Sequence, residues 1–346
     1  MIGSREQAEK WKGEAEMFRR MVHITWLFAA FVALAVPAQA QTPVQKITFL
    51  TNYTFAGRDT PYFVGVEKGF FRQTGFDVTI EPATGSGFVV TAVDSRKADY
   101  GMADPGSVIK GVANGAKIKG FMVFMDVTTS GLASLKPYET PQSLYGARIA
   151  AAETDDARII LPIIYHEKGL DIGKIHWIAA DPSVYVSLLL SGQTDLYTAS
   201  LDGDIPALQA IVAPQKKTVS FASFADWGYD PFGYLLVTQA DRIAAHPDEV
   251  KRFAAAIAES VAWSVAHPDE AAAIMAKDNP TLKPETVRAQ WLQSIKAIET
   301  PYVKEHGYGV ATPERVQRTI DLVGQSIKLP SKPAAEAVFA EGMIAK

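Results

Sequence analysis

The chain of 346 residues contains no cysteine. Disulfide bonds, thiolate metal sites and a cysteine nucleophile are therefore excluded, and so is the lipid-modified cysteine that can tether an exported protein to a membrane. Five of the six histidines, His166, His176, His246, His267 and His306, lie beyond residue 40 and show no spacing typical of a metal site. We therefore expect neither a metal nor a cofactor.

Basic residues are not in excess. The formal net charge is −4, and the part after residue 40 carries 29 Lys and Arg against 34 Asp and Glu, or −5. A protein with this balance is not expected to bind nucleic acid. With 48% hydrophobic and 21% charged residues, the chain is too apolar for disorder and long enough for one large or two moderate domains.

Residues 17–40 have the pattern of a secretory signal peptide. Two arginines precede the apolar stretch 24–36, and Ala38 and Ala40 provide the small residues of a cleavage site. A membrane anchor is the alternative, but this stretch is shorter than the roughly 20 residues that a bilayer requires. We therefore expect cleavage after Ala40 and release into the periplasm. The extension 1–16 matches no part of a leader, and we expect it to carry no function.

Beyond residue 44, short apolar runs alternate with helix-like segments, which is typical of an α/β protein with mostly parallel sheets. A stretch that carries Gly and Pro, 128–141, interrupts this pattern and predicts the start of a second domain. The expected strands are Ile47–Leu50, Asp77–Ile80, Tyr100–Met102, Ile118–Met125, Arg148–Ala151, Ile175–Ala179, Leu196–Thr198 and Tyr234–Thr238.

The segment Glu67–Ile80 reads EKGFFRQTGFDVTI and resembles a stretch near the mature start of type II periplasmic substrate-binding proteins of ABC importers. The similarity is greatest to the branch that includes binding proteins for thiamine pyrimidine precursors, sulfonates and nitrate. Further phrases follow in the family's order, at Lys97–Met102, Ala113–Ile118, Leu144–Ile149, Gly192–Leu196 and Pro268–Ala271. The resemblance spans nearly all of residues 44–330.

The resemblance implies a two-lobe fold, with each lobe a mostly parallel sheet flanked by helices and a ligand cleft between the lobes. Lobe 1 would be discontinuous, 44–130 and 234–346, and lobe 2 would be 131–233. The crossover segments would lie near Ser130–Pro137 and Phe224–Gly233. The implied partners are a small-molecule ligand and the permease subunits of an importer, and we expect a monomer.

The resemblance does not imply an enzyme in this case. The eukaryotic thiamine-pyrimidine synthase of the same branch uses a cysteine-rich motif with iron, and this chain has no cysteine. Ser107 and Lys110 have the Ser-x-x-Lys spacing of acyl-serine enzymes, but the companion motifs are absent. We therefore expect a binding protein. A periplasmic enzyme on a similar fold and a sensor domain are the alternatives from other classes.

Open α/β sheets bind ligands at the loops beyond strand carboxyl ends and at helix N-termini. In the first lobe this predicts ligand contacts from Asn52, Tyr53, Phe55, Thr84, Gly85, Ser86, Gly87, Asp104 and Ser107, followed by Thr128–Ser130. In the second lobe it predicts Thr154, Asp155, Arg158, Asp202, Tyr229 and Asp230. Structural roles remain open for each. Asn52 can satisfy a turn, Tyr53 and Phe55 can belong to the core, and Arg158 can balance the carboxylates of a helix start.

Two ligand classes follow from these residues. Asn52, Asp104 and Asp202 would suit a neutral or cationic nitrogen heterocycle such as a thiamine pyrimidine precursor. Arg158 and the amides of Gly85–Gly87 would instead suit a sulfonate, a taurine-like anion or an aromatic carboxylate. The heterocycle is our main prediction.

Overall fold

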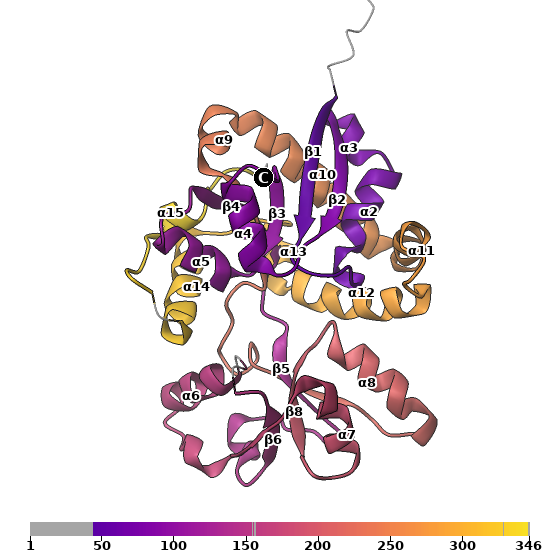
Figure 1. Ribbon diagram of the computed structural model, residues 1–346, viewed down its shortest axis with the longest axis vertical. Helices are drawn as coiled ribbons and strands as arrows, with labels where there is room; N and C mark the ends of the chain where they lie inside the picture. Colours follow the sequence, from indigo (N-terminus) through magenta and orange to yellow (C-terminus); the bar gives the residue numbers. More distant parts are fainter. Residues whose placement is uncertain (1–43, 154, 156, 328, 345–346) are drawn as a thin grey trace, which may run out of the picture. The chain divides into compact units, whose positions relative to one another are not determined.

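The computed structural model describes residues 44–344 except 154, 156 and 328, all within one unit of the chain, Val44–Lys346. The predicted leader and the extension before it lie outside these residues. Two five-stranded sheets organise the unit (Figure 1). The first has the order β2-β1-β3-β10-β4, and its strands are β1 (Gln45–Thr51), β2 (Phe76–Pro82), β3 (Tyr100–Ala103), β4 (Ile118–Met125) and β10 (Tyr234–Gln239). The second has the order β7-β6-β8-β5-β9, and its strands are β5 (Ser130–Ser134), β6 (Arg148–Ala151), β7 (His176–Ala179), β8 (Leu196–Ser200) and β9 (Ser220–Ser223).

Both sheets are mixed. In the first, β1 pairs in parallel with β2 and β3, whereas β10 pairs antiparallel with β3 and β4. In the second, β6 pairs in parallel with β7 and β8, whereas β5 pairs antiparallel with β8 and β9. The predicted α/β class is confirmed, and so is the prediction of mostly parallel sheets, because β10 in the first sheet and β5 in the second are each antiparallel to both of their neighbours, so the other four strands of each sheet run in one direction. The antiparallel strands β5 and β10 are the ones by which the chain arrives from the other sheet, and they enter from the opposite end.

Helices flank both sheets, and many begin with proline, whose missing amide hydrogen is not needed in the first turn. Those that follow the strands of the first sheet are η1 (Gly57–Asp59), α2 (Thr60–Glu67), α3 (Phe70–Gln73), α4 (Ser86–Asp94), α5 (Pro105–Ala113), α9 (Ala240–Ala245), α10 (Pro247–Ala266), α11 (Pro268–Asp278), α12 (Pro284–Ile298), α13 (Pro301–His306), α14 (Pro313–Ser326) and α15 (Ala335–Val338). Those that follow the strands of the second sheet are η2 (Pro141–Leu144), α6 (Ala157–Glu167), η3 (Ile172–Lys174), η4 (Pro182–Val184), α7 (Tyr185–Leu190), α8 (Asp204–Val212) and η5 (Ala213–Gln215).

The first sheet is buried on both faces. Phe49 of β1 belongs to a cluster with Phe253 of α10, whereas the next residue, Leu50, belongs to a separate cluster with Val89 of α4. Phe253 also stacks on Tyr100 of β3, with ring centroids 4.0 Å apart. Strands covered on both faces need apolar side chains at successive positions, which explains why the sequence shows them as continuous apolar runs.

Two segments connect the sheets. The chain passes from β4 to β5 through residues 126–129 and returns from β9 to β10 through residues 224–233. The predicted crossover near Ser130–Pro137 contains β5 in its first half, so the segment between the sheets precedes it in the chain. A Cβ on Gly131 would lie 2.4 Å from the backbone oxygen of Ala222 and 2.4 Å from the Phe221 ring, so this strand needs small residues and lacks an apolar signature. The lobe boundaries stay a prediction.

Candidate ligand-binding site

A cavity of about 470 Å³ lies where the two sheets and the two connecting segments meet. Its lining includes residues beyond the carboxyl ends of first-sheet strands, residues of both connecting segments and side chains from α6 and α14. The lining residues are Asn52, Ser86, Asp104, Pro105, Gly106, Ser107, Lys110, Thr128, Thr129, Ser130, Ile159, Ile160, Tyr229, Pro231, Phe232, Gly233, Tyr234, Val323 and Ile327. We refer to this cavity as the central pocket.

Asp104 organises one wall of the central pocket. It follows the fully buried strand β3 and caps α5, because its Oδ1 accepts from the Ser107 amide at 2.8 Å and its Oδ2 accepts from the Ser107 hydroxyl at 2.6 Å. Its own amide donates to Ser86 Oγ at 3.0 Å. This network joins the loop before α4 to the start of α5, and it holds three predicted residues in the lining.

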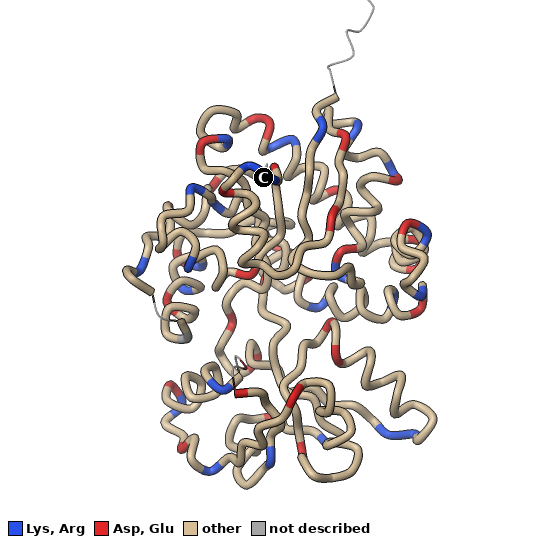
Figure 2. Tube along the Cα trace, in the orientation of Figure 1, with Lys and Arg blue, Asp and Glu red and all other residues tan. Residues whose placement is uncertain are grey.

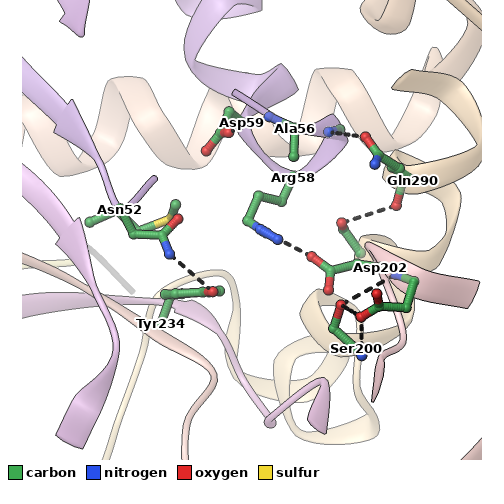
Figure 3. Close-up of polar contacts among 12 residues, drawn as sticks. Asn52, Ala56, Arg58, Asp59, Ser200, Asp202, Tyr234 and Gln290 are labelled. Atoms are coloured by element: carbon green, nitrogen blue, oxygen red, sulfur yellow. Dashed lines mark hydrogen bonds and ion pairs between the residues drawn. The ribbon is translucent and has the colours of Figure 1, made fainter. Parts of the chain in front are cut away.

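Asn52 and Tyr234 form a second wall. Asn52 directly follows β1, and its Nδ2 donates to the Tyr234 hydroxyl at 3.2 Å (Figure 3). This bond fixes the amide and leaves the carbonyl oxygen of Asn52 as an acceptor. Burial raises the pKa of Tyr234 to about 12, although Arg58 opposes the shift, so the phenol is neutral and can donate.

The connecting segments form the third wall. The Thr128 amide donates to the Pro231 carbonyl at 2.9 Å, and the Gly233 amide donates to the Met125 carbonyl at 2.9 Å, so the two segments run together. Thr128 and the buried Tyr229 line the central pocket from these segments. Any change in the path of the connections therefore changes the walls of the pocket.

Two aromatic residues predicted for the site lie elsewhere. Tyr53 is 55% exposed and does not line the central pocket. Phe55 packs edge-on against Phe63 of α2, with ring centroids 5.1 Å apart, in a cluster with residues of α11. The chain turns away from the pocket after Asn52, so these two side chains do not line it, and their contact with a ligand stays a prediction. Tyr229, Phe232 and Tyr234 supply the aromatic surface instead.

The glycine-bearing loop Thr84–Gly87 contributes only one residue to the lining. Ser86 is buried and faces the central pocket, whereas Thr84 and Gly87 are exposed and do not line it. Gly85 has φ of 139°, a conformation that favours glycine, and it precedes α4 without reaching the pocket. The four residues therefore do not act together as an anion cradle in this cavity.

Arg158 is committed to backbone carbonyls. Its Nε donates to Ala152 at 2.8 Å and its Nη2 to Ala151 at 3.0 Å, at the end of β6, while the guanidinium lies over the Trp177 ring at 5.0 Å. It does not line the central pocket. Asp155 accepts from Thr198 Oγ1 at 2.5 Å and from the Ala157 amide at 2.9 Å, so it caps α6.

The remaining predicted residues of the second lobe have different positions. Thr154 lies outside the described residues. Asp230 pairs with Arg318 of α14 at 2.5 Å. Asp202, which follows β8, is 2% exposed and accepts at Oδ2 from Arg58 Nε of η1 at 2.9 Å. Asp202 does not line the central pocket, but this ion pair joins elements of the two sheets beside it (Figure 3).

Sequence reasoning missed two cations of this region. Lys110 lines the central pocket one helical turn after Ser107, and that i, i+3 spacing was visible in the sequence. Arg58 lies in a turn-rich stretch where no local pattern distinguishes it from a solvated side chain. Only its contact with a residue 144 positions away reveals its placement.

Over the part of the chain that the structure describes, no cluster of three His, Cys, Asp or Glu side chains is arranged to hold a metal ion. Within the same residues, no helix combines the length and apolar character needed to cross a membrane. Lys and Arg positions alternate with Asp and Glu positions around both sheets (Figure 2).

Comparisons with known proteins give the family. The model of NMT1/THI5-like proteins matches residues 58–271. A protein of Brucella abortus (strain 2308) whose given name calls it a binding protein is 24% identical over 245 residues, which cover 68% of this chain and 74% of the relative. The 4-amino-5-hydroxymethyl-2-methylpyrimidine phosphate synthase of Candida albicans (strain WO-1) is 23% identical over 282 residues, 76% of this chain and 82% of the relative.

Among solved structures, the periplasmic aliphatic sulphonate binding protein SsuA from Escherichia coli matches with a TM-score of 0.65 at 13% identity. The match covers 86% of this chain and 92% of that one. The chain thus has the periplasmic binding protein fold that its sequence predicted, and it belongs to the NMT1/THI5-like family.

Proposed function

We propose that the protein captures a small organic molecule in the central pocket and delivers it to the permease subunits of an ABC-type importer. The observation that carries this proposal is the composition of the lining. Strand ends of the first sheet, both connecting segments and Ile160 of the second-sheet helix α6 contribute to one cavity. A ligand there would contact all of these elements, so binding would favour one arrangement of them over others.

The ligand that this lining suits best is a nitrogen heterocycle of the size of a thiamine pyrimidine precursor. Asn52, Tyr229 and Tyr234 combine aromatic surface with neutral donors and acceptors, which are the groups that recognise a flat, polar ring. The Candida albicans relative is named for a pyrimidine phosphate, which supports the same class.

The anion-binding alternative keeps only Ser86 of the residues first assigned to it, because Arg158, Gly85 and Gly87 do not line the central pocket. A specific observation still favours an acidic group on the ligand, since Lys110 contributes a cation to the lining. We therefore keep a heterocycle or aromatic ring that carries an acidic group as the second candidate.

The same proposal includes export and a monomeric, two-lobe form. Cleavage after Ala40 would release the protein into the periplasm, and the lobes would be 44–130 with 234–346 and 131–233. We also propose binding without catalysis. The hydroxyl of Ser107, the candidate nucleophile, donates a hydrogen bond to the carboxylate of Asp104 that caps α5.

Titration of the cleaved protein with 4-amino-5-hydroxymethyl-2-methylpyrimidine tests the proposal. Saturation at about 100 times the dissociation constant should add about 2.7 kcal/mol to the free energy of unfolding and raise the melting temperature. Asn52→Ala should weaken binding about 10-fold, which corresponds to the loss of one hydrogen bond. The control variant Tyr53→Ala, at the exposed neighbouring position, should leave the affinity unchanged. Mass spectrometry should recover the molecule unchanged. Absence of binding, or equal effects of the two variants, would contradict the proposal.

A further inference from the structure

Arg58 and Asp202 form an ion pair between elements that belong to different sheets. Arg58 lies in η1 after β1, and Asp202 lies between β8 and α8. The Nε of Arg58 donates to Oδ2 of Asp202 at 2.9 Å, and the two side chains are only 14% and 2% exposed. The contact is therefore largely shielded from water, where a charged group depends strongly on its partner.

The pair is incomplete on both sides. A guanidinium and a carboxylate can form two parallel hydrogen bonds, but here a single bond joins them. Among the described residues, the two amino groups of Arg58 have no hydrogen-bond acceptor. The Oδ1 of Asp202 is buried and also has no partner. Two donor nitrogens of the guanidinium are thus left without an acceptor among the described residues.

These donors lie next to the central pocket. The guanidinium carbon of Arg58 is 5.6 Å from the ring centroid of Tyr234, which lines the pocket and accepts from Asn52. Figure 3 shows Arg58 between Tyr234 and Asp202, with its side chain directed away from the neighbouring Asp59. Arg58 does not line the pocket itself, but a ligand that lies against Tyr234 would have its guanidinium close by.

We propose that Arg58 receives an oxyanion on the imported molecule and that Asp202 occupies this position when no ligand is bound. The inference rests on the proposed function and adds to it that the ligand carries a carboxylate, sulfonate or phosphate group. A planar guanidinium can donate two parallel hydrogen bonds to such an oxyanion, whereas Arg58 donates a single one to Asp202. Asp202 then acts as a competitor that sets the affinity for the anion.

A competitor and a structural latch give opposite results when Asp202 is neutralised. If the ion pair only holds the two sheets together, Arg58→Gln and Asp202→Asn both weaken ligand binding. If Asp202 competes with the ligand, Asp202→Asn frees the guanidinium and strengthens binding of anions, whereas Arg58→Gln weakens it. The sign of the Asp202→Asn effect therefore separates the two roles.

The test uses probe pairs that differ in charge: benzoate with benzamide, benzenesulfonate with benzenesulfonamide, and 4-amino-5-hydroxymethyl-2-methylpyrimidine with its phosphate ester. In the wild-type protein at least one anion should bind more tightly than its neutral partner. Arg58→Gln should weaken that anion roughly 30-fold or more, the lower end of the effect of removing one partner from a buried charge pair. Asp202→Asn should strengthen it, and neither variant should alter binding of the neutral partner.

Controls make the outcome specific. Arg242 and Asp99 form another partly buried ion pair, with side chains 18% and 29% exposed and 2.6 Å between Nη2 and Oδ1, at the end of β3 remote from Asp104. Arg242→Gln and Asp99→Asn should leave all affinities unchanged. The double variant Arg58→Gln with Asp202→Asn leaves no unpaired buried charge, and it should lose the preference for anions even if a single variant does not fold.

Three results would overturn the inference: no anion bound more tightly than its neutral partner by the wild-type protein, weaker anion binding by Asp202→Asn, or an unchanged preference in the double variant. Neutral probes that still bind in those cases would leave the proposed function intact. Failure of every probe to bind would instead count against the proposed function, and the inference would fall with it.

Discussion

Asp59, beside Arg58, should make the stability of the protein decrease as the pH rises toward neutrality. Its side chain is 1% exposed. Oδ2 accepts from the Ala56 amide at 2.9 Å, whereas Oδ1 is buried and has no partner among the residues that the structure describes. Burial raises the pKa of Asp59 to about 7 from its ordinary value of 3.8, although Arg58 and the Ala56 amide oppose the shift.

The sign follows from which state binds the proton more tightly. Between pH 4 and pH 7 the folded protein keeps the proton of Asp59, whereas the unfolded chain releases it. Raising the pH through this window therefore favours unfolding, by about 1.4 kcal/mol for each pH unit at most and about 4 kcal/mol over the whole window. Above pH 7 both states are deprotonated and the contribution of Asp59 becomes constant.

Denaturation by urea between pH 5 and pH 8 measures this effect in the wild-type protein and in Asp59→Asn. Asparagine keeps an oxygen for the Ala56 amide but does not titrate. The free energy of unfolding of the wild-type protein, relative to the variant, should fall by about 3 kcal/mol across this range, since most of the titration lies within it. Other ionisable groups contribute equally to both proteins and cancel.

The variant Arg58→Gln provides a second test of the Asp59 titration. Arg58 lowers the pKa of Asp59, so its removal should move the decline in stability to higher pH. Parallel pH curves for the wild-type protein and Asp59→Asn would refute the reasoning, because they would show that this carboxylate titrates alike in the folded and unfolded states.

Three further substitutions test the packing around the site. Trp291→Ala, which removes a fully buried ring whose Nε1 donates to Ser264 at 3.0 Å, should lower the free energy of unfolding by about 3–5 kcal/mol in urea titrations. Gly57→Ala should lower the melting temperature and reduce the free energy of unfolding by about 1–3 kcal/mol, because the new Cβ would lie 2.4 Å from the Gln290 Cβ. An unchanged melting temperature would mean that α12 can shift to make room for the methyl group. Asp104→Ala should lower stability by about 1 kcal/mol through loss of the α5 cap, and a neutral result would contradict the capping geometry.

The parts of the fold that the sequence predicted are those in which local pattern and tertiary burial agree. Strands β1, β4 and β10 are covered on both faces, so their apolar runs were sufficient evidence. Strands β5 and β9 were missed because their residues are small or polar. In β5, Gly131 is required because Phe221 and Ala222 of the paired strand β9 approach it closely. This requirement becomes visible only when the two strands are paired.

For the candidate site, too, the sequence predicted the positions that follow from local pattern and missed those that depend on tertiary contacts. Asn52, Ser86 and Asp104 were chosen because each lies just beyond a strand or at a helix start, and the structure places all three in the lining of the central pocket. Their contact with a ligand stays a proposal. Strand-end reasoning gives the correct edge of a sheet, but it does not say toward which side the chain turns next. That is why Tyr53, one residue after Asn52, is exposed and does not line this pocket.

The two arginines show where this reasoning stops. Arg158 was a reasonable candidate because it lies one turn into a helix that follows a strand, yet the carbonyls of Ala151 and Ala152 take its hydrogen bonds. Arg58 had no such pattern, but folding places it against Asp202, and its two amino groups have no acceptor in the described part of the chain. Whether a cation can receive a ligand depends on which of its donors the protein itself consumes. The number of donors left over depends on contacts between residues far apart in the chain. For an arginine, the acceptors that the folded protein supplies therefore determine its availability to a ligand more than its position in the sequence does.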